Sequence, residues 1–366
     1  MKKSDFIFML LRSALWKQPL EHFEMTPWEY KAVMNDADKQ CVTGLITDCL
    51  RSNNIGLKKK CVIHMLKLQK ALDVENQRIN GNLDLLLKLM EKHGVHPIIV
   101  KGQSIGTLYP KPNLRVPGDI DFYVSHHEFE TALQALGEEW LEEDVSLKDI
   151  KKKEYGFDYQ GTRMELHRFL VIFANKKIMS YFDNLVETSN HSTVKIGNTI
   201  VPIMEPNFNI LYTFCHIYHH FIMEGVGLRQ LCDLAILIHT QKKRIDKVSL
   251  NEMLKETNYT NAFKAFGSIL ISKIGLPKDD FPFQLKKKDY KRGKKVLKEI
   301  LRTGNWGLYG RKTHELNLKF TLETGKIVIS HCLKYFMLSP CENFSLLTRY
   351  VPIRIKEMFK RILKKA

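Results

Sequence analysis

The sequence has few cysteines and no long apolar run, and each absence excludes a class of protein. Seven cysteines are scattered over 366 residues without a CxxC pair, which is unlike the dense spacing of a secreted disulfide scaffold. No stretch approaches the roughly 18 apolar residues of a membrane-spanning helix. The apolar run at residues 6–11 is too short for the core of a signal peptide. We therefore expect a cytoplasmic protein.

The sequence also lacks internal repeats and low-complexity tracts, and its aromatic share of 10% excludes wholesale disorder. At about 150 residues per domain, a chain of 366 residues predicts two to three domains.

Positively charged residues are numerous but unevenly distributed along the chain. Residues 284–366 carry 21 basic and 6 acidic side chains, whereas the other 283 residues carry 36 and 34. The basicity therefore belongs to the C-terminal region.

Helical and strand patterns follow one another in an order that predicts an α+β fold. Apolar residues recur at spacings of three and four up to about residue 92, and again from about residue 206 to 273. Strand patterns lie between them, at residues 96–101, 119–124, 154–159 and 162–169, with a hairpin around Gly197-Asn198. We expect a helical N-terminal segment (1–79), a small mixed-sheet core (80–205), a helical domain (206–283) and a basic C-terminal region (284–366).

Two carboxylates stand one residue apart in the run Gly118-Asp119-Ile120-Asp121. Because side chains alternate along a strand, Asp119 and Asp121 point to the same face. Carboxylates this close repel each other unless a divalent cation neutralises them, and Mg²⁺ takes such oxygen ligands alongside substrate phosphates. The pair predicts a metal and phosphate site, although DxD also arises by chance and at the ends of structural strands.

A lysine and a glycine follow the first predicted strand, in the sequence KGQS at residues 101–104. Gly102 lets backbone N–H groups approach a phosphate, and Lys101 supplies positive charge. A Lys-Gly pair after a strand is also ordinary turn chemistry. The pair gains weight here because the paired acids lie on the next strand.

A third carboxylate, Glu165, lies on a later strand in the sequence MELH at residues 164–167. Alternation places it on the strand face of His167 rather than with its apolar neighbours. A lone glutamate on an edge strand would simply face solvent. Together with the paired acids and the glycine-containing turn, it favours two-metal nucleotidyl transfer.

These residues carry a resemblance to a known family. The run VKGQSIGTLYPKPNLRVPGDIDFYV, followed by ELHR and GVGLRQLCDLAIL, resembles the bacterial nucleotidyltransferase-like family. Its members have a KG turn, an R-x-x-GDID strand and an E-x-H or D-x-H strand. The family is part of the polymerase-beta-type nucleotidyltransferase superfamily. The resemblance covers about residues 80–240, and a weaker match at residues 304–307 extends it.

The superfamily pattern is a Gly-Ser turn, an Asp-x-Asp strand and one further acid on a later strand. By position, the resemblance implies that the catalytic and metal-binding residues are Asp119, Asp121 and Glu165. It implies that the residues on the nucleotide side are Lys101, Gly102, Ser104, Arg115, Gly118 and His167. The sequence departs from many members in having Gln103 between the glycine and the serine.

The resemblance also implies a reaction. Two Mg²⁺ ions and a nucleoside triphosphate such as ATP are the expected cofactors and substrate, and an acceptor hydroxyl attacks the α-phosphate while pyrophosphate leaves. The acceptor stays open among a protein, a sugar or lipid phosphate, a small metabolite and RNA. One rival is an inactive nucleotide-binding protein of the same fold. Its weakness is that a dead site has no need of three closely placed acids.

Two other features suggest further rivals. The sequence HIYHH places His216 and His220 four residues apart, with His219 beside them. This spacing can hold a metal. Because no HExxH pattern follows, packing is the favoured role of these histidines.

The basic stretches at residues 286–295 and 349–365 suit contact with an anionic membrane or a polyanion. The second of them predicts an amphipathic helix, which equally suits packing on its own domain.

Overall fold

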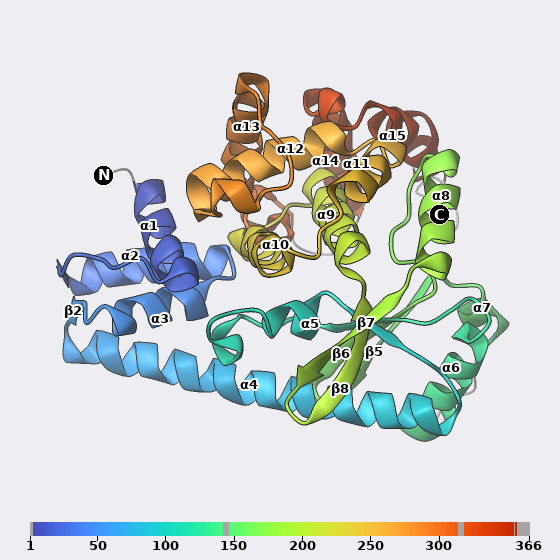
Figure 1. Ribbon diagram of the computed structural model, residues 1–366, viewed down its shortest axis with the longest axis horizontal. Helices are drawn as coiled ribbons and strands as arrows, with labels where there is room; N and C mark the ends of the chain where they lie inside the picture. The colour runs from blue at the N-terminus through green and yellow to red at the C-terminus, as the bar shows by residue number, and fades with distance from the viewer. Residues whose placement is uncertain (1–2, 142–145, 314–317, 355, 357–366) are drawn as a thin grey trace. The chain divides into compact units, whose positions relative to one another are not determined.

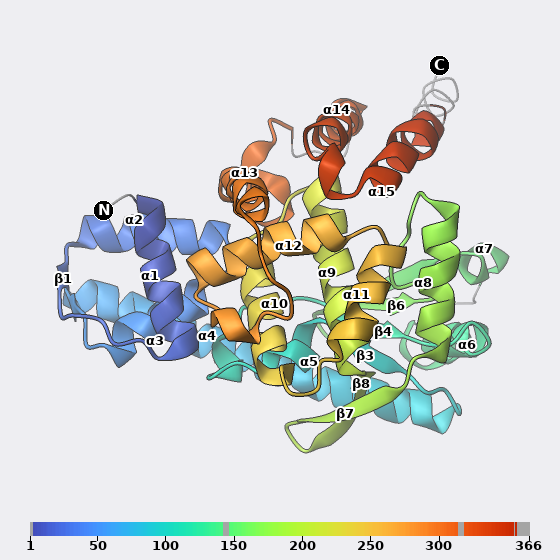
Figure 2. The same ribbon diagram turned by 45° about the horizontal axis from the view of Figure 1, so that its top comes forward.

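Helices make up most of the chain, and small sheets separate two helical stretches, which confirms the expected α+β class (Figures 1 and 2). The structure, a computed structural model, describes residues 3–141, 146–313, 318–354 and 356. The chain divides into two units. Unit 1 consists of Met1–Met34, Thr43–Leu170 and Leu185–Asn209, and unit 2 of Asn35–Val42, Val171–Asn184 and Ile210–Ala366. The finer division into four parts stays a prediction.

The elements have the following bounds. The α-helices are α1 (Lys3–Trp16), α2 (Pro27–Lys39), α3 (Thr43–Ser52), α4 (Lys59–Lys92), α5 (Gly102–Gly106), α6 (Phe129–Leu136), α7 (Leu147–Ile150), α8 (Lys176–Thr188), α9 (Pro206–Met223), α10 (Leu228–Gln241), α11 (Lys247–Glu256), α12 (Thr260–Ile269), α13 (Lys287–Thr303), α14 (Leu318–Lys334) and α15 (Pro340–Ser345). The strands are β1 (Glu24–Met25), β2 (Gly56–Leu57), β3 (Ile98–Val100), β4 (Ile120–Tyr123), β5 (Glu154–Tyr159), β6 (Thr162–His167), β7 (His191–Ile196) and β8 (Thr199–Met204).

The main sheet of unit 1 has four strands in the order β3-β4-β6-β5. Strand β4 is antiparallel to β3 and parallel to β6, and β5 and β6 form an antiparallel hairpin, so the sheet is mixed as expected. The parallel pairing sets Asp121 opposite Glu165 and Tyr123 opposite His167. Residues far apart in the sequence thus become neighbours on one sheet.

One face of this sheet packs on α4 and α6 through an apolar core. Phe122, Met164 and Leu166 from the strands are buried against Leu83 and Leu86 of α4. Since side chains alternate along a strand, the odd-numbered positions of β4 and β6 must lie on the opposite face. The apolar face therefore fixes which face carries the polar side chains.

Several boundaries differ from the sequence-based expectation. The first strand ends at Val100, because Lys101 adopts a positive φ of 55° that breaks the extended backbone. The second begins at Ile120 rather than at Asp119. The predicted hairpin is confirmed as β7 and β8, and Gly197 takes the positive φ that a tight turn requires.

Unit 2 is helical, as the pattern from residue 206 predicts. Rings from α9 and α12 interlock in its core, with Phe214 against Phe263 and Phe266 in edge-to-face contacts. The basic stretch at residues 286–295 lies mostly on α13, whereas the predicted basic helix at residues 349–365 falls largely outside the described residues. None of the helices in the described part of the chain combines the length and apolar composition needed to cross a membrane.

Candidate active site

Two carboxylates stand side by side on the polar face of the main sheet. Asp121 on β4 pairs in register with Glu165 on β6, and directly opposed residues on neighbouring strands have adjacent side chains. The side chain of Asp121 is 3% exposed and that of Glu165 is 30% exposed. One acid is therefore buried in the site while the other reaches solvent.

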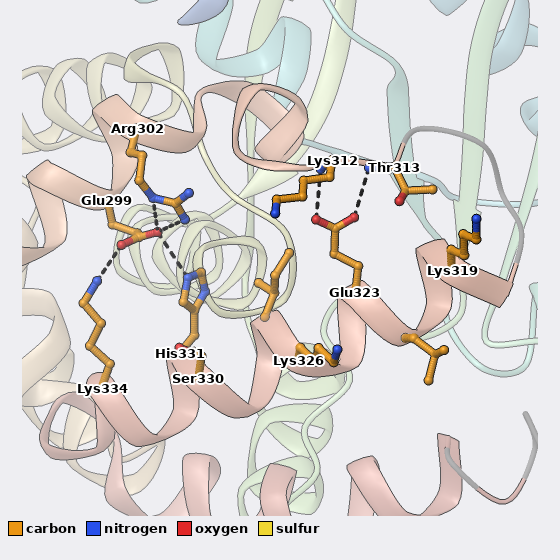
Figure 3. Close-up of a pocket in the computed structure, with 12 residues that line it drawn as sticks. Glu299, Arg302, Lys312, Thr313, Lys319, Glu323, Lys326, Ser330, His331 and Lys334 are labelled. Carbon is orange, nitrogen blue, oxygen red and sulfur yellow. Dashed lines mark hydrogen bonds and ion pairs between the residues drawn. The ribbon is translucent and has the colours of Figure 1, made fainter.

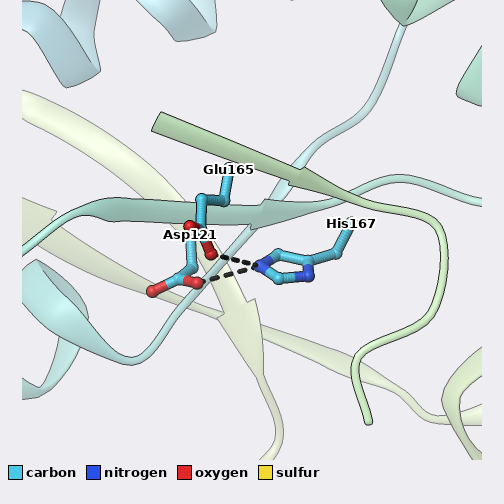
Figure 4. Close-up of side chains that lie close together, drawn as sticks. All are labelled: Asp121, Glu165 and His167. Atoms are coloured by element: carbon cyan, nitrogen blue, oxygen red, sulfur yellow. Dashed lines mark hydrogen bonds and ion pairs between the residues drawn. The ribbon is translucent and has the colours of Figure 1, made fainter. Parts of the chain in front are cut away.

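The imidazole of His167 points at both carboxylates (Figure 4). Its Nε2 atom lies 2.8 Å from Oδ1 of Asp121 and 3.7 Å from Oε2 of Glu165. Because an ionised carboxylate can only accept, Nε2–H donates the hydrogen bond to Asp121. The sequence placed His167 among the nucleotide-side residues, and the structure brings it into direct contact with a predicted metal ligand.

The ammonium group of Lys101 completes this cluster. Its Nζ atom lies 2.7 Å from Oδ1 of Asp121. The contact depends on the turn after β3, where Lys101 has a φ of 55° and Gly102 a φ of 36°. A positive φ is unfavourable for a residue with a side chain, so the fold holds Lys101 in a strained turn with its ammonium group at the acids.

The electrostatics of the two carboxylates differ. Burial alone would raise the pKa of Asp121, but the charge of Lys101 and the hydrogen bond from His167 lower it to about 2. Burial raises the pKa of Glu165, and the negative charges of Asp121 and Asp119 raise it further. The three carboxylates lie near the ammonium of Lys101 and the guanidinium of Arg163, whose Nε atom is 4.0 Å from Oε1 of Glu165. The repulsion among the carboxylates that remains in the raised pKa of Glu165 favours the entry of another cation.

Asp119 lies just before β4, close enough for its charge to raise the pKa of Glu165. It is outside the three-residue cluster of Asp121, Glu165 and His167. Among the other predicted residues, Gly118 is exposed and Arg115 is buried in the loop that leads to the strand. The structure thus gathers Lys101, Asp121, Glu165 and His167 tightly, with Asp119 at the edge of the group.

The turn at residues 102–104 is the start of the short helix α5. The hydroxyl of Ser104 donates to the carbonyl of Lys101 at 2.7 Å. Gln103, the departure from the superfamily pattern, is buried and its amide donates to the side chains of Asn76 and Asn80 on α4. The extra residue therefore anchors the turn to the long helix.

Sequence reasoning missed the asparagines of α4. The side-chain amide of Asn76 donates to the carbonyls of Asn113 and Arg115, both at 3.0 Å. It thereby fixes the loop that precedes the paired acids. The signal was an Asn-x-x-x-Asn spacing at Asn76 and Asn80, which places both amides on one face of a helix.

The donor set fits a divalent cation. Asp121, Glu165 and His167 each offer a ligand atom, and these atoms lie within 4.8 Å of one another. Carboxylate oxygens are the donors that Mg²⁺ and Mn²⁺ prefer, and an imidazole nitrogen suits several transition metals. In the part of the chain that the structure describes, this is the one cluster of three or more His, Cys, Asp or Glu side chains with such spacing.

The histidines of HIYHH lie on α9 and make packing contacts. The rings of His216 and His220 are 4.3 Å apart at their centroids, and Nδ1 of His220 donates to Glu224 at 3.0 Å. Burial lowers the pKa of His219 to about 4. These contacts agree with the favoured packing role.

Comparison with known proteins assigns the family. A family described as uncharacterised nucleotidyltransferases matches residues 27–270. Because this match covers more than half of the chain, the chain belongs to that family. A solved structure of an antigenic nucleotidyltransferase-like protein from Paracoccidioides brasiliensis is similar over 57% of this chain and 92% of its own, with 13% identity and a TM-score of 0.29. That similarity is too weak to carry an argument, and a search of curated proteins gave no match.

Proposed function

We propose that this chain is a Mg²⁺-dependent enzyme that transfers a nucleoside monophosphate from a nucleoside triphosphate to an acceptor hydroxyl. The observation that carries the proposal is the register pairing of Asp121 with Glu165 on adjacent parallel strands. It sets one buried and one partly exposed carboxylate side by side, next to the turn at Lys101. Membership of the nucleotidyltransferase family supports the same reaction class.

The reaction is an in-line displacement at the α-phosphorus. The acceptor oxygen forms a bond to that phosphorus, the bond from the phosphorus to the bridging oxygen breaks, and pyrophosphate leaves with the bonding electrons. The acceptor hydroxyl loses its proton to the site or to solvent. When bound, Mg²⁺ lowers the pKa of that hydroxyl and neutralises the leaving phosphates.

The acids have distinct roles in this proposal. Asp119, Asp121 and Glu165 would hold the metal ions, with Glu165 on the side of the acceptor. The raised pKa of Glu165 reflects neighbouring negative charge, and a divalent cation would relieve that repulsion. His167 orients Asp121 through the hydrogen bond from Nε2.

The nucleotide side is formed by the turn after β3 and the loop before β4. Lys101 pairs with Asp121 in the structure, and it would exchange that partner for a phosphate if a cation bound the carboxylate. Gly102 and Ser104 shape the turn, and Gly118 and Arg115 belong to the loop before the strand. These five residues are proposed contacts of the triphosphate.

The proposal is tested by pyrophosphate release with each of the four nucleoside triphosphates, with Mg²⁺ and a cell extract as the source of acceptor. The Asp119→Ala, Asp121→Ala double variant should lose release. A matched control, Glu130→Ala with Glu138→Ala, removes two exposed carboxylates of the same unit and should keep it. Nucleotide binding without release in the wild type would indicate an inactive binding protein. If the wild type shows no nucleotide binding and no release, the proposal is refuted.

A further inference from the structure

A cavity of about 730 Å³ lies in unit 2 between α13 and α14 (Figure 3). Five of its lining residues are cationic: Arg302, Lys312, Lys319, Lys326 and Lys334. Glu299 and Glu323 are the acids among its lining residues. Five of the 21 basic side chains of residues 284–366 therefore line one cavity.

Both acids of the cavity are already engaged. The carboxylate of Glu299, which is 6% exposed, accepts from Lys334 at 2.6 Å and from Nε of Arg302 at 3.0 Å. The hydrogen bond from His331 holds the pKa of Glu299 well below its usual range, with Lys334 and Arg302 lowering it further. Glu299 therefore stays ionised and binds the cations at this end of the cavity.

Glu323 is engaged with the backbone instead. Its two carboxylate oxygens accept from the backbone N–H groups of Lys312 and Thr313, at 2.9 and 3.0 Å. The hydrogen bond from Lys312 lowers the pKa of Glu323, and that from Thr313 adds to it. This contact ties the segment before α14 to the helix. It uses the backbone N–H of Lys312, so the ammonium group of Lys312 is not bound by Glu323.

Three lysines of the cavity remain without an acidic partner. Lys312, Lys319 and Lys326 are exposed and form no ion pair with any residue that the structure describes. Lys319 and Lys326 are seven residues apart on α14, which places them on the same helix face two turns apart. Unneutralised cations gathered at one cavity attract an anion of matching charge.

We propose that this cavity binds a small molecule that carries two or more linked phosphate groups. A phosphate group carries a charge of about −1.5 to −2 at neutral pH, so two of them match three lysines. The hydroxyl of Ser330 and the side chains of Leu322 and Ile327 also line the cavity, and they offer polar and apolar contacts to the rest of the molecule. The site is separate from the acid cluster of the sheet and does not rest on the proposed reaction.

The shape of the site favours a small molecule over a long polyanion. The lysines all line one cavity, and its volume falls in the range of about 300–1,000 Å³ that is usual for small-molecule sites. Nucleic acid or a membrane is bound by cations spread along a track or a flat face.

The test is isothermal titration of the full chain with inorganic pyrophosphate in EDTA, without divalent cations. The Lys312→Gln, Lys319→Gln, Lys326→Gln variant should bind at least tenfold more weakly than the wild type. The control variant Lys291→Gln, Lys294→Gln, Lys298→Gln removes three exposed charges of α13 outside the cavity and should stay within twofold. All six positions are exposed, so both variants should fold, which circular dichroism checks.

Three further arms distinguish the sources of binding. The Lys312→Gln, Lys319→Gln, Lys326→Gln variant should keep wild-type release of pyrophosphate from a nucleoside triphosphate with Mg²⁺, which separates this site from the proposed active site. A 20-nucleotide single strand and vesicles containing phosphatidylglycerol should bind more weakly than pyrophosphate. The proposal is overturned if the wild type does not bind pyrophosphate, if both triple variants lose binding equally, or if the oligonucleotide or the vesicles bind more tightly through the same lysines.

Discussion

Asp121 in the sheet and Glu299 in the helical unit are two buried carboxylates with almost the same partners. Asp121 contacts Lys101 and His167, and Glu299 contacts Lys334 and His331, with Arg302 in addition. In both cases these contacts lower the pKa of the carboxyl. The immediate partners therefore do not distinguish the two regions.

The difference lies in the charges just beyond those partners. Around Asp121 the next groups are Glu165 and Asp119, whose charges act on one another. Glu299 lines a cavity together with Lys312, Lys319 and Lys326, which form no ion pair within the described part of the chain. Similar ion pairs are therefore surrounded by additional acids in unit 1 and by additional lysines in unit 2. The net charge of these surrounding groups determines whether each site attracts a cation or an anion.

Among the variants that leave Asp121 in place, the largest effect is expected from Glu165→Gln. The amide keeps the shape but removes the second negative charge of the sheet cluster, so pyrophosphate release should fall on the order of 100-fold or more. Glu130→Gln removes an exposed carboxylate of α6 in the same unit and should leave the rate unchanged. An equal loss in both variants would show that negative charge on this unit in general, rather than this pair, supports the reaction.

Removal of the internal cation should produce the next largest effect. Lys101→Met leaves Asp121 buried beside Glu165 without the ammonium, which should lower the free energy of unfolding in EDTA by about 3 kcal/mol. Added Mg²⁺ should restore most of the loss, because it supplies the missing positive charge. Urea unfolding with and without Mg²⁺ measures both effects.

Lys88→Met is the control for that variant, since it breaks an exposed ion pair with Asp84 in the same unit. Its effect should be below about 1 kcal/mol and insensitive to Mg²⁺. Equal stabilisation of the two variants by Mg²⁺ would contradict binding of the cation beside Asp121.

The cluster around Glu299 in unit 2 predicts that the free energy of unfolding depends on pH. The folded pKa of Glu299 is lowered relative to the unfolded value of about 4.3, so its contribution to stability is present above that pH. The contribution is lost as the pH falls through the folded pKa. Urea unfolding of wild type and Glu299→Gln should thus differ most at neutral pH and converge as the pH falls below about 4. A difference that does not change with pH would contradict this.

The smallest effect is expected for Gln103, which only positions the turn beside the acids. Gln103→Ala removes the amide that anchors the turn to α4, and it should lower stability by about 1 kcal/mol and pyrophosphate release by a few fold. Gln134→Ala on the exposed side of α6 should change neither. A loss of rate in Gln103→Ala as large as in Glu165→Gln would mean that Gln103 contacts the substrate.

Much of the sheet was predictable from the sequence because its signals are local. Alternation along β6 placed Glu165 and His167 on one face, and the Gly197-Asn198 turn indicated the β7–β8 hairpin. The pairing of Asp121 with Glu165 was not predictable in this way. It depends on a parallel register between strands that are 44 residues apart in the sequence, and periodicity carries no information about register.

Two further features depend on tertiary structure. The contact between Lys101 and Asp121 needs a positive φ at Lys101, which sequence patterns do not indicate for a lysine. The cavity in unit 2 needs α13 and α14 to bring Glu299 and Lys334 together across 35 residues. The sequence showed the excess of lysines there but not the cavity they line.

The central claim is that the acidic surplus around Asp121 forms the catalytic centre. Pyrophosphate release with Mg²⁺ and a nucleoside triphosphate, compared between Asp121→Asn and Glu299→Gln, tests it most directly, because both changes neutralise a buried carboxylate held by a lysine and a histidine. The account predicts a loss of at least about 1,000-fold for Asp121→Asn and a rate within about twofold of wild type for Glu299→Gln. Equal rates in the two variants would contradict it.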